Sequence, residues 1–218
     1  MVASNIELIA IASRSLYVSG MAVALSSLLG IPFGAWLGLS RGRVVSLARL
    51  ITHTGMAFPP VVVGLLLYIL LSRSGPLGSL GWLLTPKAMI LAQFFLSLPF
   101  VVGITMASVA TVPSELLLQL RSLGATHWQA RWAVLREAKA GVLLAIAAAY
   151  GRSISEVGAV MIVGGNIRGE TRVLTTAIVL ETGQGAFEFA LALGGILLSL
   201  SLLVNCLVLC LQPTGSAT

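Results

Sequence analysis

Apolar stretches long enough to cross a lipid bilayer run through most of this sequence. A spanning helix needs about 20 predominantly apolar residues, and residues 15–39, 88–109 and 187–211 each meet that length. Of the 218 residues, 57% are hydrophobic and 9% are charged, whereas soluble domains carry roughly 25% charged residues. We therefore expect an all-α integral membrane protein, because helices satisfy their own backbone hydrogen bonds in lipid.

Five transmembrane helices account for the apolar stretches. They are expected at about 15–39, 50–71, 88–109, 141–163 and 187–211. The second contains Pro59 and Pro60, which remove backbone donors and must break or kink the helix. Such breaks survive in a membrane only where protein or water satisfies the freed groups. Residues 173–180 are apolar but too short to span, so they predict a small helix that dips into the protein.

The spans form a single transmembrane domain, residues 15–211. Residues 1–14 hold the start of the first helix, where Ser4 followed by Glu7 predicts a capping box. Residues 212–218 are a short polar tail.

Basic residues predict the orientation. The chain has 13 Lys and Arg against 7 Glu, a net charge of +6, and an excess of basic residues marks cytoplasmic loops and anionic headgroups. With the loops after the first and third spans in the cytoplasm, that side holds about seven basic residues and the other about five. This favours an outside N-terminus and a cytoplasmic C-terminus. No soluble fold is present to display a basic patch to nucleic acid.

The polar segment 111–140 cannot cross lipid and predicts a helix–turn–helix. Residues 115–123 are rich in helix-forming residues. Gly124 then ends that helix, as glycine does at C-terminal caps. Thr126, with Gln129 three residues later, predicts a capping box that begins a second helix.

The second helix is amphipathic and basic. Trp128, Trp132 and Leu135 fall at i, i+4 and i+7, which gives one apolar stripe. The other face carries Gln129, Arg131, Arg136 and Lys139. An interfacial helix that merely anchors a loop through its tryptophans is one interpretation of this pattern.

A second interpretation comes from a family resemblance. Residues 118–141, followed by GRSISEVGAVMIVGGNI, resemble the coupling loop and next span of bacterial ABC importer permeases of the molybdate/tungstate/sulfate branch. The GRSISEVGAVMIVGGNI run looks especially like tungstate permeases. FPPVVVGLLL in the second span and the RSGPLG turn after it also resemble this family, so the resemblance covers about residues 15–211.

The sequence departs from the family at two places in the loop. The family's Glu-Ala-Ala box falls on residues 118–120, which are Leu, Gln and Leu. The Leu-Pro that follows the second helix in the family is replaced by the region of Arg136 and Glu137. Gly124 and Ala125 remain in place.

The resemblance implies a type I ABC importer permease fold in the cytoplasmic membrane of a bacterium or archaeon. Two copies would form a pore that moves an oxyanion, tungstate or else molybdate, delivered by an external oxyanion-binding protein. Each coupling helix would contact one of two ATP-binding subunits, which hold ATP and magnesium. The expected coupling residues are Leu123, Gly124, Ala125, Thr126, His127, Trp128, Gln129 and Arg131.

No catalytic, cofactor or metal site is expected in this chain itself. It contains no GxxxxGK[ST] phosphate-binding loop, which excludes it as the ATPase. His53 and His127 are too few and too scattered for a metal site or a catalytic dyad.

Arg152 and Glu156 lie inside the fourth span, where ionisable residues are costly and suggest function. They are four residues apart, so they share a helix face and can neutralise each other. Alternatively, Arg152 draws an oxyanion along a translocation pathway that includes Ser155, Glu156 and Asn166. The amides of residues 164–166 can meet an anion or form a plain turn.

Arg168 and Arg172 are outer loop charges that are solvated, dock an acidic face of a binding protein or gather anions. Two other classes of protein remain open from the sequence. A proton-coupled or facilitative carrier would need a relay of intramembrane carboxylates, and only Glu156 is available. A structural subunit of a membrane complex would leave the broken spans and the amphipathic loop unexplained.

Overall fold

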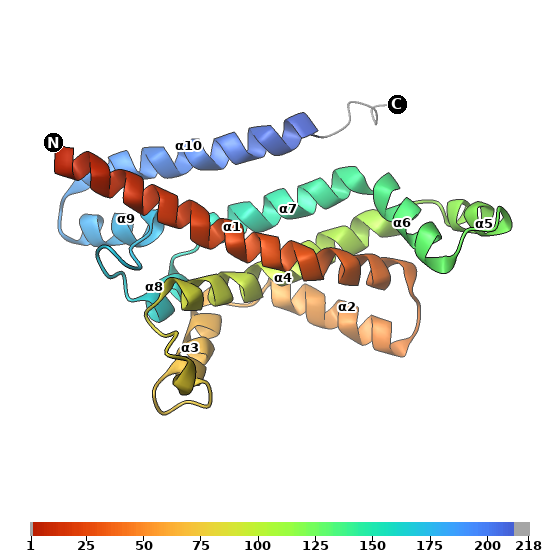
Figure 1. Cartoon of the computed structure of the whole chain (residues 1–218), viewed down its shortest axis with the longest axis horizontal. Helices are drawn as coiled ribbons and strands as arrows, with labels where there is room; N and C mark the ends of the chain where they lie inside the picture. Colours follow the sequence, from red (N-terminus) through yellow and green to blue (C-terminus); the bar gives the residue numbers. More distant parts are fainter. Residues whose placement is uncertain (1, 212–218) are drawn as a thin grey trace.

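The computed structural model describes residues 2–211, and its regular elements are all helical (Figure 1). They are α1 (Val2–Leu39), α2 (Arg43–Met56), α3 (Pro60–Leu71), the 3₁₀ turn η1 (Gly78–Leu80), α4 (Pro86–Ala110), α5 (Ser114–Ser122), α6 (His127–Glu137), α7 (Lys139–Ile154), α8 (Gly158–Gly164), α9 (Leu174–Gly183) and α10 (Phe187–Leu211). The expected all-α fold is confirmed. The predicted tail, 212–218, lies outside the described residues.

Three straight helices and two bent pairs are long and apolar enough to cross a membrane. The straight ones are Glu7–Leu39 of α1, α4, and Phe187–Val208 of α10. The α2–α3 pair bends by 100° and the α7–α8 pair by 58°. With each pair counted as one broken span, the total is the five that the sequence predicts. Helix α9 coincides with the expected short apolar helix.

Pro59 and Pro60 break the second span as predicted. Pro59 is the N-cap of α3 and Pro60 its first residue, a position where the missing N–H would have no helical partner in any case. Pro32 and Pro99 lie inside α1 and α4 without ending either helix.

The predicted capping box at the N-terminus is wrong. Helix α1 already includes Val2, so Ser4 lies inside the helix rather than at its N-cap. Glu7 instead accepts a hydrogen bond from Arg168 Nε at 2.8 Å. The pattern failed because a Ser-x-x-Glu spacing carries no information about a basic partner 161 residues away.

Helices α1 and α4 pack closely through a glycine stripe, and Figure 1 shows them crossing near the centre of the molecule. Gly30, Gly34 and Gly38 recur every four residues on α1 and face α4. A Cβ at Gly34 would lie 2.6 Å from the carbonyl oxygen of Val102, and one at Gly38 2.8 Å from that of Met106. Small residues at this spacing let two helix backbones approach in a membrane, where van der Waals packing replaces the hydrophobic effect.

The second halves of the two broken spans also pack on each other. A Cβ at Gly64 of α3 would lie 2.7 Å from Cα of Ala159 on α8. Val160 and Val163 of α8 are fully buried in the same apolar cluster as Met89 of α4. The bends therefore bring α3 and α8 together against α4.

Gly34→Ala tests the α1–α4 contact, with Gly20→Ala on the same helix as its control. The added methyl at residue 34 must displace backbone, and we expect a loss of about 1–3 kcal/mol in stability. No atom outside the helix lies within 4 Å of a Cβ at Gly20, so that change should be neutral or slightly stabilising. Thermal midpoints of the detergent-solubilised variants measure the difference, and equal midpoints would contradict the packing.

Candidate functional site

The turn between α5 and α6 has the geometry that Gly124 predicts. Gly124 has a φ of 86°, a conformation that favours glycine. Its N–H donates to Arg121 O at 3.0 Å, and Ala125 N–H donates to Leu120 O at 3.0 Å. These two bonds form a Schellman motif, which satisfies the last carbonyls of α5 and fixes the direction in which the chain leaves it.

The start of α6 is closed by the predicted capping box. The side chain of Thr126 accepts from Gln129 N–H at 3.3 Å, and the Gln129 side chain accepts from Thr126 N–H at 2.8 Å. Across the turn, the guanidinium of Arg121 lies 2.9 Å from Nδ1 of His127. Helices α5 and α6 therefore form a hairpin that is capped on both sides of Gly124 and projects from one end of the molecule (Figure 1).

The tip of this hairpin is exposed. Leu123 is 85% exposed and Trp128 is 73% exposed, and large apolar side chains on a surface mark interaction sites when they gather. Ala125 is half-buried, and Arg131 is exposed. The eight predicted coupling residues therefore share one continuous turn with accessible apolar side chains.

The buried face of α6 differs from the stripe of large apolar residues. Ala130 and Val134 are the residues that α6 buries, at 0% and 1% exposure. Val134 packs in a cluster with Ala35 of α1 and Val109 of α4. The stripe of large apolar residues in the sequence favoured the tryptophans as the packing face of α6. The helix instead buries small side chains, because it lies close to the ends of α1 and α4.

Helix α6 continues into α7 with almost no interruption. Ala138 is both the C-cap of α6 and the N-cap of α7. Its N–H donates to Val134 O at 2.9 Å, and its carbonyl accepts from Val142 N–H at 3.1 Å. The hairpin is therefore joined to α7 without an intervening loop.

Arg152 and Glu156 form the expected pair at the other end of α7. Arg152 donates to Glu156 Oε2 at 2.9 Å, and Glu156 is only 4% exposed. The second carboxylate oxygen, Oε1, accepts from Ala159 N–H at 3.1 Å in the first turn of α8. Thr175 donates to the Glu156 carbonyl at 2.9 Å. The Glu156 carboxylate thus neutralises Arg152 in the last turn of α7 and caps the first turn of α8.

The structure does not bring the four predicted pathway residues together. Ser155 donates to Gly151 O at 2.8 Å within its own chain segment. Asn166 follows the far end of α8, whose seven residues separate it from Glu156 by about 10 Å of helix. Arg152, Ser155 and Glu156 therefore form one group at the α7–α8 break, and Asn166 belongs to another.

Two backbone amides at the Gly164–Asn166 turn are bonded within the chain. Gly165 and Asn166 both have positive φ, 71° and 52°. Gly165 N–H donates to Met161 O at 2.9 Å, and Ile167 N–H donates to the Thr171 hydroxyl at 2.9 Å. These bonds occupy the amides of Gly165 and Ile167, which fits the plain-turn interpretation at those two positions.

Arg168 and Arg172 are tied to α1 rather than simply solvated. Both pair with Glu7, and the Glu7 carboxylate raises the pKa of Arg168 above its ordinary value through its hydrogen bond. From α1, Arg14 donates to the carbonyls of Gly169 at 2.6 Å and Arg172 at 2.9 Å. Ion pairs and hydrogen bonds thus hold the loop after α8 against the N-terminal half of α1.

A buried polar pair between α4 and α7 escaped the sequence analysis. Gln93 Nε2 donates to Ser153 O at 3.0 Å, and the Ser153 hydroxyl donates to Gln93 Oε1 at 3.0 Å. Gln93 is 3% exposed, so this pair joins two spans next to Arg152. The signal was available, because Gln93 is the only amide side chain in residues 88–109.

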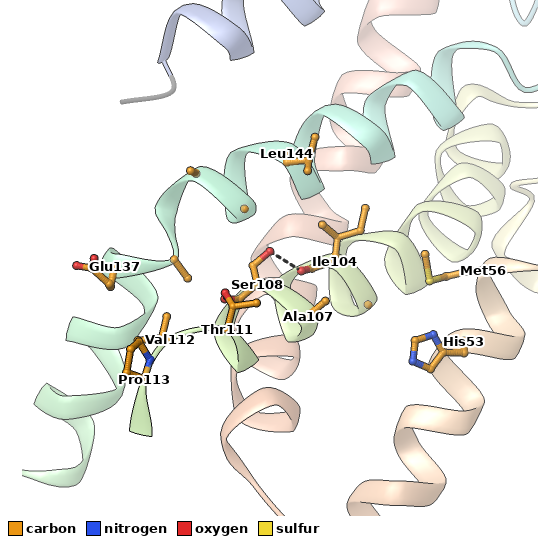
Figure 2. A pocket seen from close by; sticks show the side chains of 14 residues that line it. His53, Met56, Ile104, Ala107, Ser108, Thr111, Val112, Pro113, Glu137 and Leu144 are labelled. Atoms are coloured by element: carbon orange, nitrogen blue, oxygen red, sulfur yellow. Dashed lines mark hydrogen bonds between the residues drawn. The ribbon is translucent and has the colours of Figure 1, made fainter. Parts of the chain in front are cut away.

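A cavity of about 680 Å³ lies beside the hairpin (Figure 2). Its lining comes from α2, α4, the α4–α5 connection, the α6–α7 junction and the first half of α7: His53, Met56, Gly103, Ile104, Ala107, Ser108, Thr111, Val112, Pro113, Glu137, Ala138, Ala140, Gly141 and Leu144. Figure 2 shows His53 on one side and Glu137 on the other. Ala138 lies in its wall, so the α6–α7 junction forms part of the cavity.

Comparison with known proteins gives consistent matches over most of the chain. The family described as "Binding-protein-dependent transport system inner membrane component" matches residues 30–214. A probable anion ABC transporter permease protein of Haloferax volcanii is 47% identical over 92% of this chain and 88% of the relative. The tungstate uptake system permease protein TupB of Peptoclostridium acidaminophilum is 41% identical over 91% and 87%.

Two more distant proteins also match most of the chain. The molybdenum transport system permease protein ModB of Mycobacterium tuberculosis is 30% identical over 94% of this chain and 80% of the relative. A solved structure described as an amino acid ABC transporter with histidines superposes with a TM-score of 0.70 at 20% identity. It covers 97% of this chain and 95% of that chain, which shows the shared fold.

Removing the charges of Arg152 and Glu156 shows whether this pair stabilises the fold or Arg152 guides the transported anion. Arg152→Met alone leaves a buried carboxylate unpaired and should cost about 3–5 kcal/mol in stability. Arg152→Met with Glu156→Gln removes both charges and keeps an oxygen that can accept from Ala159 N–H, so we expect most of that loss to be recovered. Thermal midpoints measure the recovery. A double variant as unstable as the single one would contradict the pairing, and oxyanion uptake by the folded double variant tests whether Arg152 guides the anion.

Proposed function

Because this chain belongs to the family of binding-protein-dependent transport system inner membrane components, we propose that it is the permease that moves tungstate, or else molybdate, into the cell. Membership of the family makes it a multi-pass transport subunit that works with an ATPase and a substrate-binding protein. The substrate proposal is supported by the relatives, since the tungstate permease is 41% identical and the molybdenum permease 30% identical.

The observation that carries the proposal is the doubly capped α5–α6 hairpin. Its exposed turn offers Leu123 and Trp128 to a partner, while Ala130 and Val134 hold its other face against the spans. A hairpin fixed at both caps transmits force, because its turn cannot unwind without losing the Schellman and capping-box bonds. We assign residues 123–129 and Arg131 to the contact with the ATPase.

Two copies of the chain are proposed to form the pore, served by two ATP-binding subunits. The exposed apolar surface of α2 and α3 is available for a second copy to contact. Its large exposed residues include Leu50, Ile51, Val61, Leu65 and Leu66. ATP and magnesium would be bound by the ATPase subunits, and no cofactor is assigned to this chain.

The proposed orientation places the hairpin in the cytoplasm, the N-terminus outside and the C-terminus inside. The hairpin has to reach an ATPase that draws on cytoplasmic ATP, and its basic residues agree with the positive-inside rule. The Glu7–Arg168 cluster then lies on the outer side, where the binding protein of a bacterial or archaeal cell would dock.

Alternating access follows from the connection between the hairpin and the broken spans. Closure of the ATPase pair would displace α6, the α6–α7 junction would carry the movement into α7, and the cavity at Ala138 would change shape. The Arg152–Glu156 corner would move with α7. A role for Arg152, Ser155, Glu156 or Asn166 in contacting the anion belongs to this proposal.

Gly124→Ala tests the coupling role, with Gly169→Ala as a matched control. Both glycines have positive φ, 86° and 82°, and at both an added Cβ would meet no neighbouring atom within 4 Å. The backbone strain, about 1–2 kcal/mol, is therefore the same, but only Gly124 lies in the hairpin. We expect Gly124→Ala to lower co-purification of the ATPase several-fold, and tungstate uptake with it, whereas Gly169→Ala should leave co-purification of the ATPase close to wild type.

A larger loss of ATPase co-purification in Gly169→Ala than in Gly124→Ala, or an equal loss in both variants, would count against coupling through this turn. Co-purification from native membranes also tests the wider proposal. A stably folded chain that purifies without any ATPase would favour an ATP-independent carrier or a structural subunit.

The substrate is tested with the reconstituted complex and its binding protein. ATP hydrolysis should rise several-fold when the binding protein is loaded with tungstate, less with molybdate and least with sulfate. Uptake of tungsten into vesicles, measured by elemental analysis, checks that hydrolysis is coupled to transport. Stimulation by sulfate alone would overturn the tungstate assignment and leave the permease function standing.

A further inference from the structure

A groove lined with tryptophan runs between the end of α1 and α6, beside the point where the two helices pack. Each helix contributes four lining residues at i, i+3, i+4 and i+7, a spacing that defines one helix face. They are Pro32, Ala35, Trp36 and Leu39 from α1, and Trp128, Arg131, Trp132 and Leu135 from α6. The two faces have the pattern of helices that pack together, yet about 160 Å³ of space lies between them.

The aromatic side chains of this α1–α6 groove are not covered by the chain. Three of the four tryptophans in the sequence line the groove. Trp36 is 36% exposed, Trp132 49% and Trp128 73%. Phe33 stacks on Trp36 with ring centroids 5.5 Å apart, which extends the aromatic surface along α1.

The position of the groove corresponds to the boundary between lipid and water. Helix α1 is the first span, and it ends at Leu39 immediately before Arg41 and Arg43. Helix α6 belongs to the hairpin outside the spans. Tryptophan gathers at this boundary because its ring is apolar and its N–H is polar. The α1 side of the groove therefore meets acyl chains, and the α6 side meets headgroups.

Two arginines place positive charge at the headgroup side. Arg131 lines the groove, and the guanidinium of Arg136 lies over the Trp132 ring, 5.7 Å from its centroid. Both are exposed. The ion pairs that the structure contains within residues 2–211 involve neither of them. An apolar slot with two such cations at its mouth complements an anionic amphiphile.

We propose that the α1–α6 groove binds an anionic phospholipid of the cytoplasmic leaflet. Part of one acyl chain lies between the two helix faces, and the phosphate lies at Arg131 and Arg136. Pockets for drug-sized ligands measure roughly 300–1,000 Å³, so 160 Å³ suits a slender chain segment. The inference rests on the cytoplasmic position of the hairpin in the proposed function, and it is independent of the oxyanion and of ATP.

The site also bears on coupling, because Trp128 and Arg131 belong to both the groove and the predicted ATPase contact. A lipid bound between α1 and α6 packs against the groove-facing side chains of α6, which the described chain leaves exposed. Anionic lipid would then hold α6 at a fixed distance from α1 while the turn at Gly124 contacts its partner.

Tryptophan fluorescence tests the proposal directly. The full chain carrying Trp82→Phe emits only from the groove tryptophans, and it is placed in nanodiscs with brominated phosphatidylglycerol or brominated phosphatidylcholine at equal mole fractions. We expect the anionic lipid to quench at a mole fraction roughly 25-fold lower than the zwitterionic one, about fivefold for each of the two arginines. If Trp82→Phe fails to fold, subtracting the emission of a Trp36→Phe, Trp128→Phe, Trp132→Phe variant from wild type isolates the same signal.

Arg131→Gln with Arg136→Gln should remove the preference, raising the half-quenching fraction of the anionic lipid by roughly fivefold for each arginine, as about 1 kcal/mol per basic residue implies. Arg41→Gln with Arg43→Gln removes the same amount of charge from the neighbouring loop and should preserve the preference for the anionic lipid. Equal quenching by both lipids, or a preference that survives the first pair of changes, would overturn the proposal.

The same titration in the complex with its ATPase separates the lipid from the partner as occupant of the groove. A preserved preference for anionic lipid supports the site in the working transporter. A preference abolished by the ATPase would show that the partner fills the groove and would overturn the lipid assignment, while the permease function would stand.

Discussion

Lipid offers no hydrogen-bond partner to a free backbone group, so each break in a spanning helix has to be repaired by the protein. The α7–α8 break shows how this chain meets that constraint. Glu156 uses one carboxylate oxygen to hold Arg152 and the other to accept from the first turn of α8, and Thr175 covers its carbonyl. At the α2–α3 break, the prolines themselves remove donors that would otherwise need partners.

Local signals in the sequence predicted the features that depend on residues within a few positions of each other. The break at Pro59 and Pro60, the turn at Gly124, the cap at Thr126 and the Arg152–Glu156 pair all have this character. Each is set by backbone chemistry or by helical periodicity, and those rules hold whatever the rest of the fold.

The features that the sequence missed are contacts between distant segments. Glu7 was taken for a helix cap because its partner, Arg168, lies at the other end of the chain. The buried pair of Gln93 and Ser153 joins residues 60 positions apart. The cavity beside the hairpin is lined by residues of α2, α4, α6 and α7, which are far apart in the sequence. The roles of the coupling and pathway residues remain predictions, since their chemistry depends on partners and anion.

Rigid connections link the candidate coupling surface to the broken spans. The hairpin leads into α7 through Ala138, and α7 ends at a corner where the doubly bonded Glu156 fixes α8 at 58°. Helix α8 in turn meets α3 where Gly64 and Ala159 leave no room for a side chain between them. In the proposed mechanism, the corner at Glu156 and the Gly64–Ala159 contact are the route by which a displacement of α6 would reach both broken spans. The buried Glu156 carboxylate has a structural part in that route, because it bonds Arg152 of α7 with one oxygen and the first turn of α8 with the other.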